Sequence, residues 1–364
     1  MARNNMNPEL IEALSRVRAS MPQSELDVAD RIAEISAKHV ETHRDRAFNS
    51  RFRKMKRSLV AHFSGDTKQH RILIVTGESH SGKTAMIENA LDNDAGFDPY
   101  PDSNGNMTMP VLRMECASPA YLVNVALDGL EALGYPMDPK TREKVAWTEF
   151  RKRLKQRKVL LVFIDEAQHS VNSTNGAELQ KLRDILKHMV QMKDWPIRII
   201  LAGVPPLEKF REDQQIRKRS MTLHLGPLTT GHNDEHVRHW VKKIVTEHAE
   251  MEIDDFMAGD FPQRLIHACG GCFGSIVQLT RLAIEEELMK GAATVGAPSF
   301  ANAYKTMTGC LVNENIFTAK TWHQIQGSGA KLESGSTSGS TTDYDDDKPC
   351  AARLKPLRGG ERPK

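Results

Sequence analysis

The chain has 364 residues, of which 39% are hydrophobic and 27% charged, and its formal net charge is +3. This length leaves room for one large domain and a smaller one, and the small net charge does not by itself indicate a nucleic-acid partner. No run of about eighteen apolar residues is present, which excludes a membrane-spanning helix, and the polar start Met-Ala-Arg-Asn-Asn lacks the apolar core of a signal peptide. The five cysteines have no framework spacing, so we expect a cytoplasmic protein in a reducing compartment. They are Cys116, Cys269, Cys272, Cys310 and Cys350.

Residues 1–65 are expected to form an N-terminal helical region with a polar surface. Apolar side chains recur there at near-helical spacing. They are Leu10, Ile11, Leu14 and Val17, followed by Leu26, Val28, Ile32 and Ile35.

The next feature is a glycine-rich octapeptide that follows an apolar run, residues 72–75, and opens a segment that can be helical. It reads Gly77-Glu78-Ser79-His80-Ser81-Gly82-Lys83-Thr84, the pattern of a P-loop. Its backbone N–H groups are expected to bind the phosphates of ATP, assisted by the dipole of the following helix. Lys83 would reach the β- and γ-phosphates, and the Thr84 hydroxyl would bind Mg²⁺. The alternative is a glycine-rich turn beside an exposed lysine.

A second motif lies roughly eighty residues further on. Residues 159–164 form a continuous apolar run, as expected of a strand buried on both faces of a parallel sheet, and Asp165-Glu166 follows it. In this Walker B element, Asp165 would hold Mg²⁺ and Glu166 would polarise the water that attacks the γ-phosphate. A solvated acidic turn is the alternative, and the spacing from the P-loop argues against it.

Residues 66–226 are predicted to form the nucleotide-binding core. Strands are expected at 72–75, 111–114, 159–164 and 197–201, and a helix with one apolar face at 179–190. Alternating strands and helices predict a three-layer α/β domain with a parallel sheet. From 227 to 326 the pattern changes to helices only, which indicates a small helical lid. Residues 327–364 have few large apolar side chains, so we expect a disordered tail.

A P-loop sheet followed by a helical lid is the AAA+ arrangement, and finer motifs narrow the resemblance. The segment Ile-Leu-Ala-Gly-Val-Pro-Pro-Leu-Glu-Lys-Phe, the stretch 213–219 and the helix entry Gly-Cys-Phe-Gly-Ser-Ile-Val-Gln-Leu-Thr-Arg-Leu-Ala occur in order over residues 65–295. In these the chain resembles the TniB/TnsC family of transposition ATPases, relatives of ExeA-type proteins. The resemblance implies an ATP-dependent regulator that forms a ring or helical filament on double-stranded DNA. It also implies two protein partners, a transposase and a target-selection protein.

The resemblance further implies a catalytic set of Lys83, Glu166 and an arginine that acts on the ATP of a neighbouring subunit. Arg219 is the first candidate and Arg217 the second, with a solvated basic loop as the alternative.

Two departures from the AAA+ pattern predict slow hydrolysis. Ala-Gly-Val follows the strand at 197–201, where many AAA+ proteins have a polar sensor, and no arginine follows Gly274 directly, so that Arg281 is a possible substitute or simply a surface residue.

Two alternatives to a transposition regulator stay open. One is a replication-initiator or helicase-loader-like ATPase, and the other is an adaptor that holds ATP structurally, which an intact Glu166 argues against.

Two basic runs are candidates for phosphate contacts with DNA. The first lies between Arg44 and Arg57, and the second spans residues 151–158. Neither has the interleaved aromatic residues that stack on single strands, so a duplex is the expected partner. The alternative for each run is a solvated face.

Overall fold

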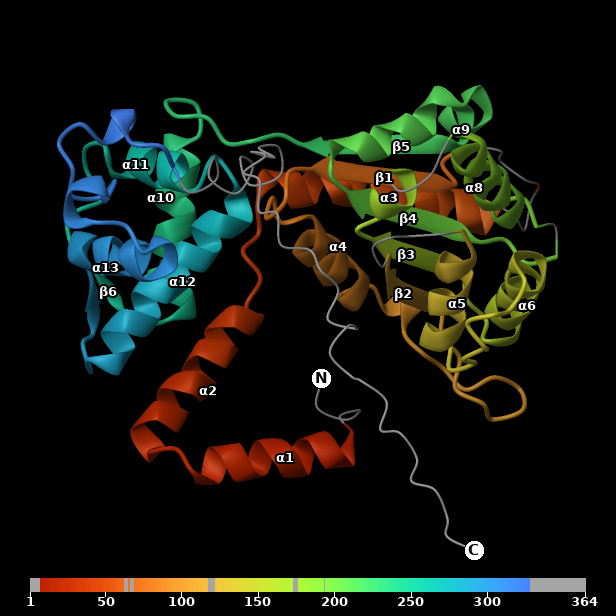
Figure 1. Cartoon of the computed structure of the whole chain (residues 1–364), viewed down its shortest axis with the longest axis horizontal. Helices are drawn as coiled ribbons and strands as arrows, with labels where there is room; N and C mark the ends of the chain where they lie inside the picture. Colours follow the sequence, from red (N-terminus) through yellow and green to blue (C-terminus); the bar gives the residue numbers. More distant parts are fainter. Residues whose placement is uncertain are drawn as a thin grey trace, which may run out of the picture.

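A computed structural model describes residues 7–61, 65, 69–116, 122–172, 176–192 and 194–327. The chain forms an α/β part and a helical part, joined by the segment that follows β5, while α1 and α2 extend to one side (Figure 1). Apart from its first residue, the predicted tail at 327–364 lies outside the described residues. No helix in the described ranges is long and apolar enough to cross a membrane.

The α/β part is built on a five-stranded parallel sheet with the order β2-β3-β4-β1-β5. Its strands are β1 (Ile72–Gly77), β2 (Val111–Glu115), β3 (Leu161–Asp165), β4 (Arg198–Gly203) and β5 (Ser220–Leu225). All six residues of β1 are buried, because β1 lies between two other strands and under helices on both faces. The carboxyl ends of β1 and β3 therefore reach the same edge of the sheet.

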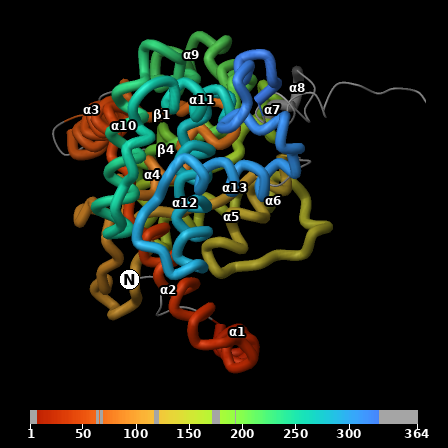
Figure 2. Tube along the Cα trace, turned by 90° about the vertical axis from the view of Figure 1, so that its left-hand side faces the viewer, coloured from red at the N-terminus to blue at the C-terminus, as the bar shows by residue number. Residues whose placement is uncertain are grey.

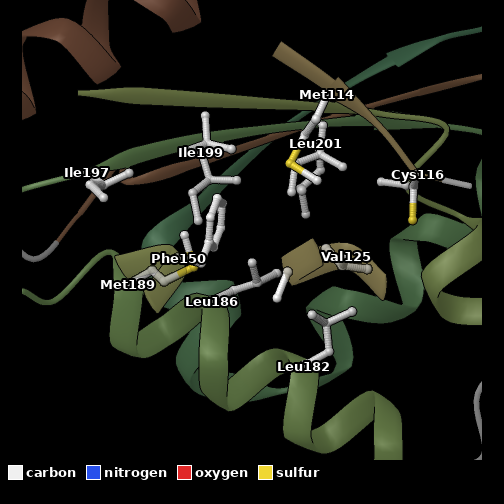
Figure 3. Close-up of a cluster of buried hydrophobic side chains, with 14 of the residues drawn as sticks. Met114, Cys116, Val125, Phe150, Leu182, Leu186, Met189, Ile197, Ile199 and Leu201 are labelled. Carbon is white, nitrogen blue, oxygen red and sulfur yellow. The ribbon is translucent and has the colours of Figure 1, made fainter. Parts of the chain in front are cut away.

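Helices cover both faces of the sheet and make it the middle of three layers. Ile72 and Ile74 face a cluster with α5 (Leu122–Ala132), α6 (Glu143–Gln156) and α8 (Gly176–Met189), whereas Leu73 and Val75 face α3 (His43–Val60) and α4 (Lys83–Asp92). Figure 3 shows the first cluster, in which Phe150, Leu186 and Met189 lie below the strands. This is the AAA+ P-loop α/β fold that the sequence predicted.

The helical part follows a linker that starts at Gly226. It contains α10 (Asp234–Lys243), a π-helical turn (Ile244–His248), α11 (Phe261–Ala268), α12 (Phe273–Met289) and α13 (Ala297–Thr308), packed on one apolar core. The prediction of helices only from residue 227 misses a small parallel pair, β6 (Glu252–Ile253) and β7 (Thr294–Val295). Strands of two residues are too short to leave an alternating pattern in the sequence.

The N-terminal region divides into two structural units. α1 (Pro8–Ala19) has no buried residue, and α2 (Gln23–Ala37) packs against α12 of the helical part. The third helix, α3, belongs to the α/β part, where Phe48, Phe52 and Met55 are buried against the sheet. The remaining short helices are η3 (Ala95–Phe97), α7 (His169–Asn172), η4 (Pro205–Glu212), α9 (Gln214–Arg219), η6 (Val312–Glu314) and η7 (Trp322–Gln324).

Candidate nucleotide-binding and catalytic site

The loop from Gly77 to Gly82 connects β1 to α4, as the P-loop pattern predicts, and glycine is required at both of its ends. A Cβ on Gly77 would lie 2.7 Å from Ser81 Oγ and 2.8 Å from the carbonyl oxygen of Leu225. Gly82 precedes the first residue of α4 with a φ of 88°, in the left-handed region that glycine tolerates best. The loop therefore ends at the N-terminus of a ten-residue helix, where backbone N–H groups and the helix dipole favour phosphate.

Lys83 is the first residue of α4 and its side chain lies beneath this loop. It is 5% exposed, and its Nζ donates to the carbonyl oxygens of Gly77 and Glu78, at 2.9 Å each. Burial lowers the pKa of Lys83, while the charges of Glu166 and Asp165 oppose that shift. The loop thus carries a cation at its centre, close to the carboxylates of β3. Of the other predicted phosphate-binding residues, Glu78, Ser79 and His80 have exposed side chains, whereas Ser81 is buried.

The two motifs meet at Thr84 and Asp165. The Thr84 hydroxyl donates to Asp165 Oδ2 at 2.6 Å, which brings together the predicted Mg²⁺ ligands from α4 and the carboxyl end of β3. A hydroxyl and a carboxylate oxygen suit Mg²⁺, which usually takes one or two protein oxygens and completes its shell with phosphate and water. The described residues contain no group of three or more His, Cys, Asp or Glu that could hold a metal ion. This donor set fits an ion bound together with a nucleotide.

Glu166 follows β3 with a φ of 49° and a half-exposed side chain. Gln168 Nε2 donates to Glu166 Oε2, and the ring of His169 lies 3.9 Å from the same oxygen. The side chain of Gln168 also reaches the end of β4, where its Oε1 accepts from the backbone N–H of Val204, the residue after the strand, at 3.2 Å. The predicted base therefore lies at the edge of the sheet beside Lys83, with a side-chain amide bound to one of its oxygens.

The helical part closes over the P-loop through the first turn of α12. The backbone N–H of Gly274 donates to the carbonyl oxygen of His80 at 2.7 Å, and a Cβ on Gly274 would lie 2.5 Å from that oxygen. Phe273 packs over Gly82, where an added Cβ would be 3.1 Å from its ring. The absence of a side chain at 274 is what permits this close approach.

A cavity of about 610 Å³ opens beside the loop, between the α2–α3 connection, α4 and α12. Arg44 lines it and is buried, donating to the carbonyl oxygens of Ser81 at 3.3 Å and Gly226 at 2.6 Å. Burial lowers the pKa of Arg44. The expectation that Arg44 belongs to a DNA-facing run is therefore wrong: it is a structural link between the P-loop and the linker to the helical part.

Arg281 lines the same cavity from α12. Its Nη2 donates to the carbonyl oxygens of Ile35 at 3.4 Å and Lys38 at 3.0 Å, at the end of α2. This side chain ties α2 to α12, so neither of the expectations for it, a sensor or a surface residue, describes its contacts.

The two arginines predicted to act in a neighbouring site, Arg217 and Arg219, lie at the amino end of the sheet, opposite to the P-loop. Asp213 caps α9 by accepting from the N–H groups of Gln215 and Ile216, and α9 ends at Arg219, directly before β5. Arg219 Nη1 donates to the carbonyl oxygen of Gln215 at 2.9 Å, and an amide oxygen of Gln191 accepts from its Nη2 and Nε at 2.6 and 3.0 Å. Arg217 is exposed. The structure therefore gathers Lys83, Thr84, Asp165 and Glu166 and leaves both arginines away from them.

Gln168 and Arg44 are the site residues that sequence reasoning missed. In the sequence, only the position of Gln168 two residues after Glu166 indicates a role. That role becomes clear only from the contact of its side chain with the end of β4. Arg44 differs from the other cations of its run only in the face of α3 on which it lies.

Residues 66–210 match the family model of an AAA domain, which covers the P-loop, both acidic residues and Gln168. The ORC2 protein of Aeropyrum pernix, in its ADPNP–ADP complexes, is 14% identical with a TM-score of 0.50, and the match covers 72% of this chain and 68% of that one. CDC6P from Pyrobaculum aerophilum is 10% identical with a TM-score of 0.50, over 78% of this chain and 72% of that one. No curated protein matches the sequence. The likeness to the two structures concerns the fold alone, and the family model identifies residues 66–210 as an AAA domain.

Proposed function

We propose that this protein is an ATP-hydrolysing AAA+ regulator of transposition, which assembles on duplex DNA in its ATP-bound state and passes a target site to a transposase. The observation that carries the nucleotide chemistry is the 2.6 Å contact between Thr84 and Asp165, because it joins the P-loop helix to the acidic end of β3. Lys83 then binds the phosphates and Glu166 takes the proton of the attacking water. Mg²⁺ bound at Thr84 and Asp165 supplies charge that neutralises phosphate oxygens.

Assembly into a ring or filament is supported by the distance between the P-loop and the candidate arginines. β1 and β5 run in parallel with Ile72 opposite Ser220 and Gly77 opposite Leu225. Six residues of strand span about 20 Å, so Arg217 and Arg219, at the amino end, are out of reach of the ATP bound by their own chain. A guanidinium there is useful for hydrolysis only if it faces the site of a second copy. Arg219 stays the first candidate and the exposed Arg217 the second.

Support for the transposition type comes from the residues that carry the resemblance to TniB/TnsC proteins. Asp213 caps the helix that presents the arginines, and Ile216 is 1% exposed beneath it. Gly274 makes the closest contact between the helical part and the P-loop. These motif positions therefore lie at two surfaces. One is the end of α9, where a second copy would bind, and the other is the contact between the helical part and the P-loop, and both would respond to the bound nucleotide.

A replication-initiator or helicase-loader-like ATPase is the second candidate, and it is favoured by the fold shared with ORC2 and CDC6P over 72% and 78% of the chain. Both candidates bind duplex DNA and ATP, so the distinction rests on what the assembly recruits. For either candidate we propose that the protein acts in the cytoplasm.

The test has two stages. First, binding to a labelled duplex is measured by fluorescence anisotropy with a non-hydrolysable ATP analogue, with ADP and without nucleotide. Tight binding only with the analogue, and on unrelated sequences, is the expected result. Second, insertion of the element that encodes the protein is mapped in cells with the wild-type chain and with Glu166→Gln. Loss of targeted insertion supports transposition, whereas normal targeting with defective replication supports the second candidate.

A further inference from the structure

The basic residues of α3 separate into two groups once the helix is packed on the sheet. Arg51 Nε donates to the carbonyl oxygen of Thr222 at 2.7 Å, and Lys56 Nζ donates to Asp94 Oδ1 at 2.7 Å. With the buried Arg44, these cations are used inside the fold. The second group is exposed and consists of Arg46, Arg53, Lys54 and Arg57.

The exposed group follows one side of the helix. Arg46, Arg53 and Arg57 are spaced by seven and four residues, which places them on one line, and Lys54 flanks them. At 1.5 Å per residue the line is about 16 Å long. Figure 2 shows α3 at the outer edge of the molecule. We call these four residues the α3 stripe.

No residue of the α3 stripe forms an ion pair with any part of the chain that the structure describes; its one side-chain hydrogen bond there is from Arg53 Nε to the carbonyl oxygen of Asn49, at 3.3 Å. Asp45, the acid within α3, is buried and bonded to Thr42 and His39. The side exposed to solvent is therefore positive along its length.

The second basic run, on α6, has a different environment. Arg153 Nε donates to Glu149 at 2.6 Å and its guanidinium lies 4.0 Å from the centre of the Tyr135 ring. Lys155 pairs with Asp194 at 2.6 Å, and Lys152 with Glu149 at 3.4 Å. Acidic side chains are interspersed with these cations, so carboxylates on α6 would repel a phosphate backbone. The α3 stripe has no such carboxylate among its four residues.

We propose that the α3 stripe is the surface through which this protein contacts duplex DNA; the proposal rests on the DNA partner of the proposed function. Arginine forks bind phosphate oxygens in pairs, and one DNA strand carries a charge every 3.4 Å along the helix axis, so a line of about 16 Å reaches up to four phosphates. The stripe has no aromatic residue to stack on bases, so we assign its cations to the phosphate backbone. Contacts of this kind hold the duplex without selecting its sequence.

The test compares two double variants with equal loss of charge, Arg53→Gln/Arg57→Gln on α3 and Lys152→Gln/Lys155→Gln on α6. Binding to a labelled duplex is measured with the ATP analogue at several salt concentrations, and thermal unfolding midpoints check the fold of both. For the α3 variant we expect about tenfold or more weaker binding and a slope of log affinity against log salt that falls by about 1.8, since each lost contact removes about 0.9. The α6 variant should bind like the wild type.

Three outcomes would overturn the assignment of the surface. The first is a normal salt slope in the α3 variant, and the second is a loss confined to the α6 variant. In the third, vesicles with phosphatidylserine bind the wild type and not the α3 variant, while duplex binding is the same for both. A wild-type chain that binds no duplex in any nucleotide state would instead contradict the proposed function, so the two failures are distinguishable.

The contacts of Gln168 lead independently to a positioning residue for ATP hydrolysis. β4 ends in Ala202-Gly203, Val204 follows, and none of the three offers a polar side chain to the site. Gln168 fills that place: it is 4% exposed, donates to Glu166 Oε2 and accepts from Val204 N–H. A Cβ on Gly203 would lie 2.2 Å from Gln168 Oε1, so the amide fits only against glycine.

We infer that Gln168 holds one oxygen of Glu166 and leaves the other for the attacking water. Gln168→Leu removes both the donor to Glu166 and the acceptor for Val204, whereas Gly203→Ala keeps the amide and displaces it. Both should lower kcat for ATP about tenfold or more with little change in KM, because neither touches the phosphate-binding loop. Normal kcat in both, or a parallel rise in KM, would show that Gln168 only supports the fold.

Discussion

The two ends of the parallel sheet differ in how their charged residues are arranged. At the carboxyl end, Lys83, Thr84, Asp165 and Glu166 come from two neighbouring elements and lie within reach of one another. At the amino end, Arg219 is bound by Gln191 and the backbone of its own helix, and Arg217 faces solvent. We propose on this basis that one chain binds ATP with its own groups, and that its arginines, which lie at the far end of the sheet, act on a different chain. The comparison leads to a testable division: ATP binding would be a property of the monomer, and full hydrolysis a property of the assembly.

The largest effect is expected at the carboxyl end with Lys83→Ala. A hydrogen bond to a charged group contributes about 1.5–3 kcal/mol, and on our proposal the ammonium contacts two phosphates, so ATP affinity should fall roughly 100-fold or more. Isothermal titration with the ATP analogue measures it. Lys290→Ala, which removes the exposed lysine directly after α12, serves as the control and should bind normally. Unchanged affinity in Lys83→Ala would place the nucleotide elsewhere.

Glu166→Gln, also at the carboxyl end of the sheet, should separate ATP binding from ATP hydrolysis. Removing a general base lowers turnover by about 10²–10⁴-fold, while the phosphate contacts of the loop stay intact. We expect wild-type ATP affinity, loss of phosphate release and assemblies that persist on DNA with ATP. Normal turnover would mean that another residue activates the water.

A smaller effect is expected where the helical part meets the P-loop. Gly274→Ala places a Cβ 2.5 Å from the carbonyl oxygen of His80, and overpacking of this kind costs about 1–3 kcal/mol. The contact should open and ATP affinity should fall roughly tenfold. Gly226→Ala is a matched control, because its Cβ would have only ordinary contacts, the nearest at 3.8 Å from His224. Equal affinities in the two variants would show that closure of α12 does not affect nucleotide binding.

Removal of the divalent ion should give the smallest loss of binding. Thr84 and Asp165 supply only two protein oxygens, so most of the affinity for ATP comes from the loop and Lys83. With EDTA we expect hydrolysis to stop and affinity for the analogue to drop about tenfold or less, as measured by the same titration. Hydrolysis that continues in EDTA would contradict the role of these two residues.

Much of the carboxyl end was predictable from the sequence, because buried strands leave continuous apolar runs and their motifs follow directly. β1 and β3 were found in this way, together with Lys83, Thr84, Asp165 and Glu166. β5 was not, since Ser220–Leu225 alternates apolar and polar residues at the edge of the sheet. Gln168 could not be recognised either, because its role depends on Gly203, which is distant in the chain and supplies space rather than a side chain.

The charge runs show a second limit of sequence patterns. Residues 44–57 read as one basic segment, and helix packing then buries Arg44, bonds Arg51 and Lys56 within the fold and exposes the α3 stripe. The run on α6 is equally basic in the sequence, and only the structure brings Asp194 and Tyr135 against it. Contacts between distant segments decide which cations are available to a partner.

The most direct test of the central claim is a mixing experiment with Lys83→Ala and Arg219→Ala. If Arg219 acts on the ATP of a second copy, Arg219→Ala alone should bind ATP normally and hydrolyse it slowly, and Lys83→Ala alone should be inactive. Mixed on duplex DNA, they create some interfaces with an intact P-loop on one side and an intact arginine on the other, so ATP hydrolysis should partly return. No recovery although both variants co-assemble, or normal hydrolysis by Arg219→Ala alone, would contradict a role for Arg219 in a neighbour's site. The same mixture made with Arg217→Ala then decides whether any arginine at this end of the sheet completes that site.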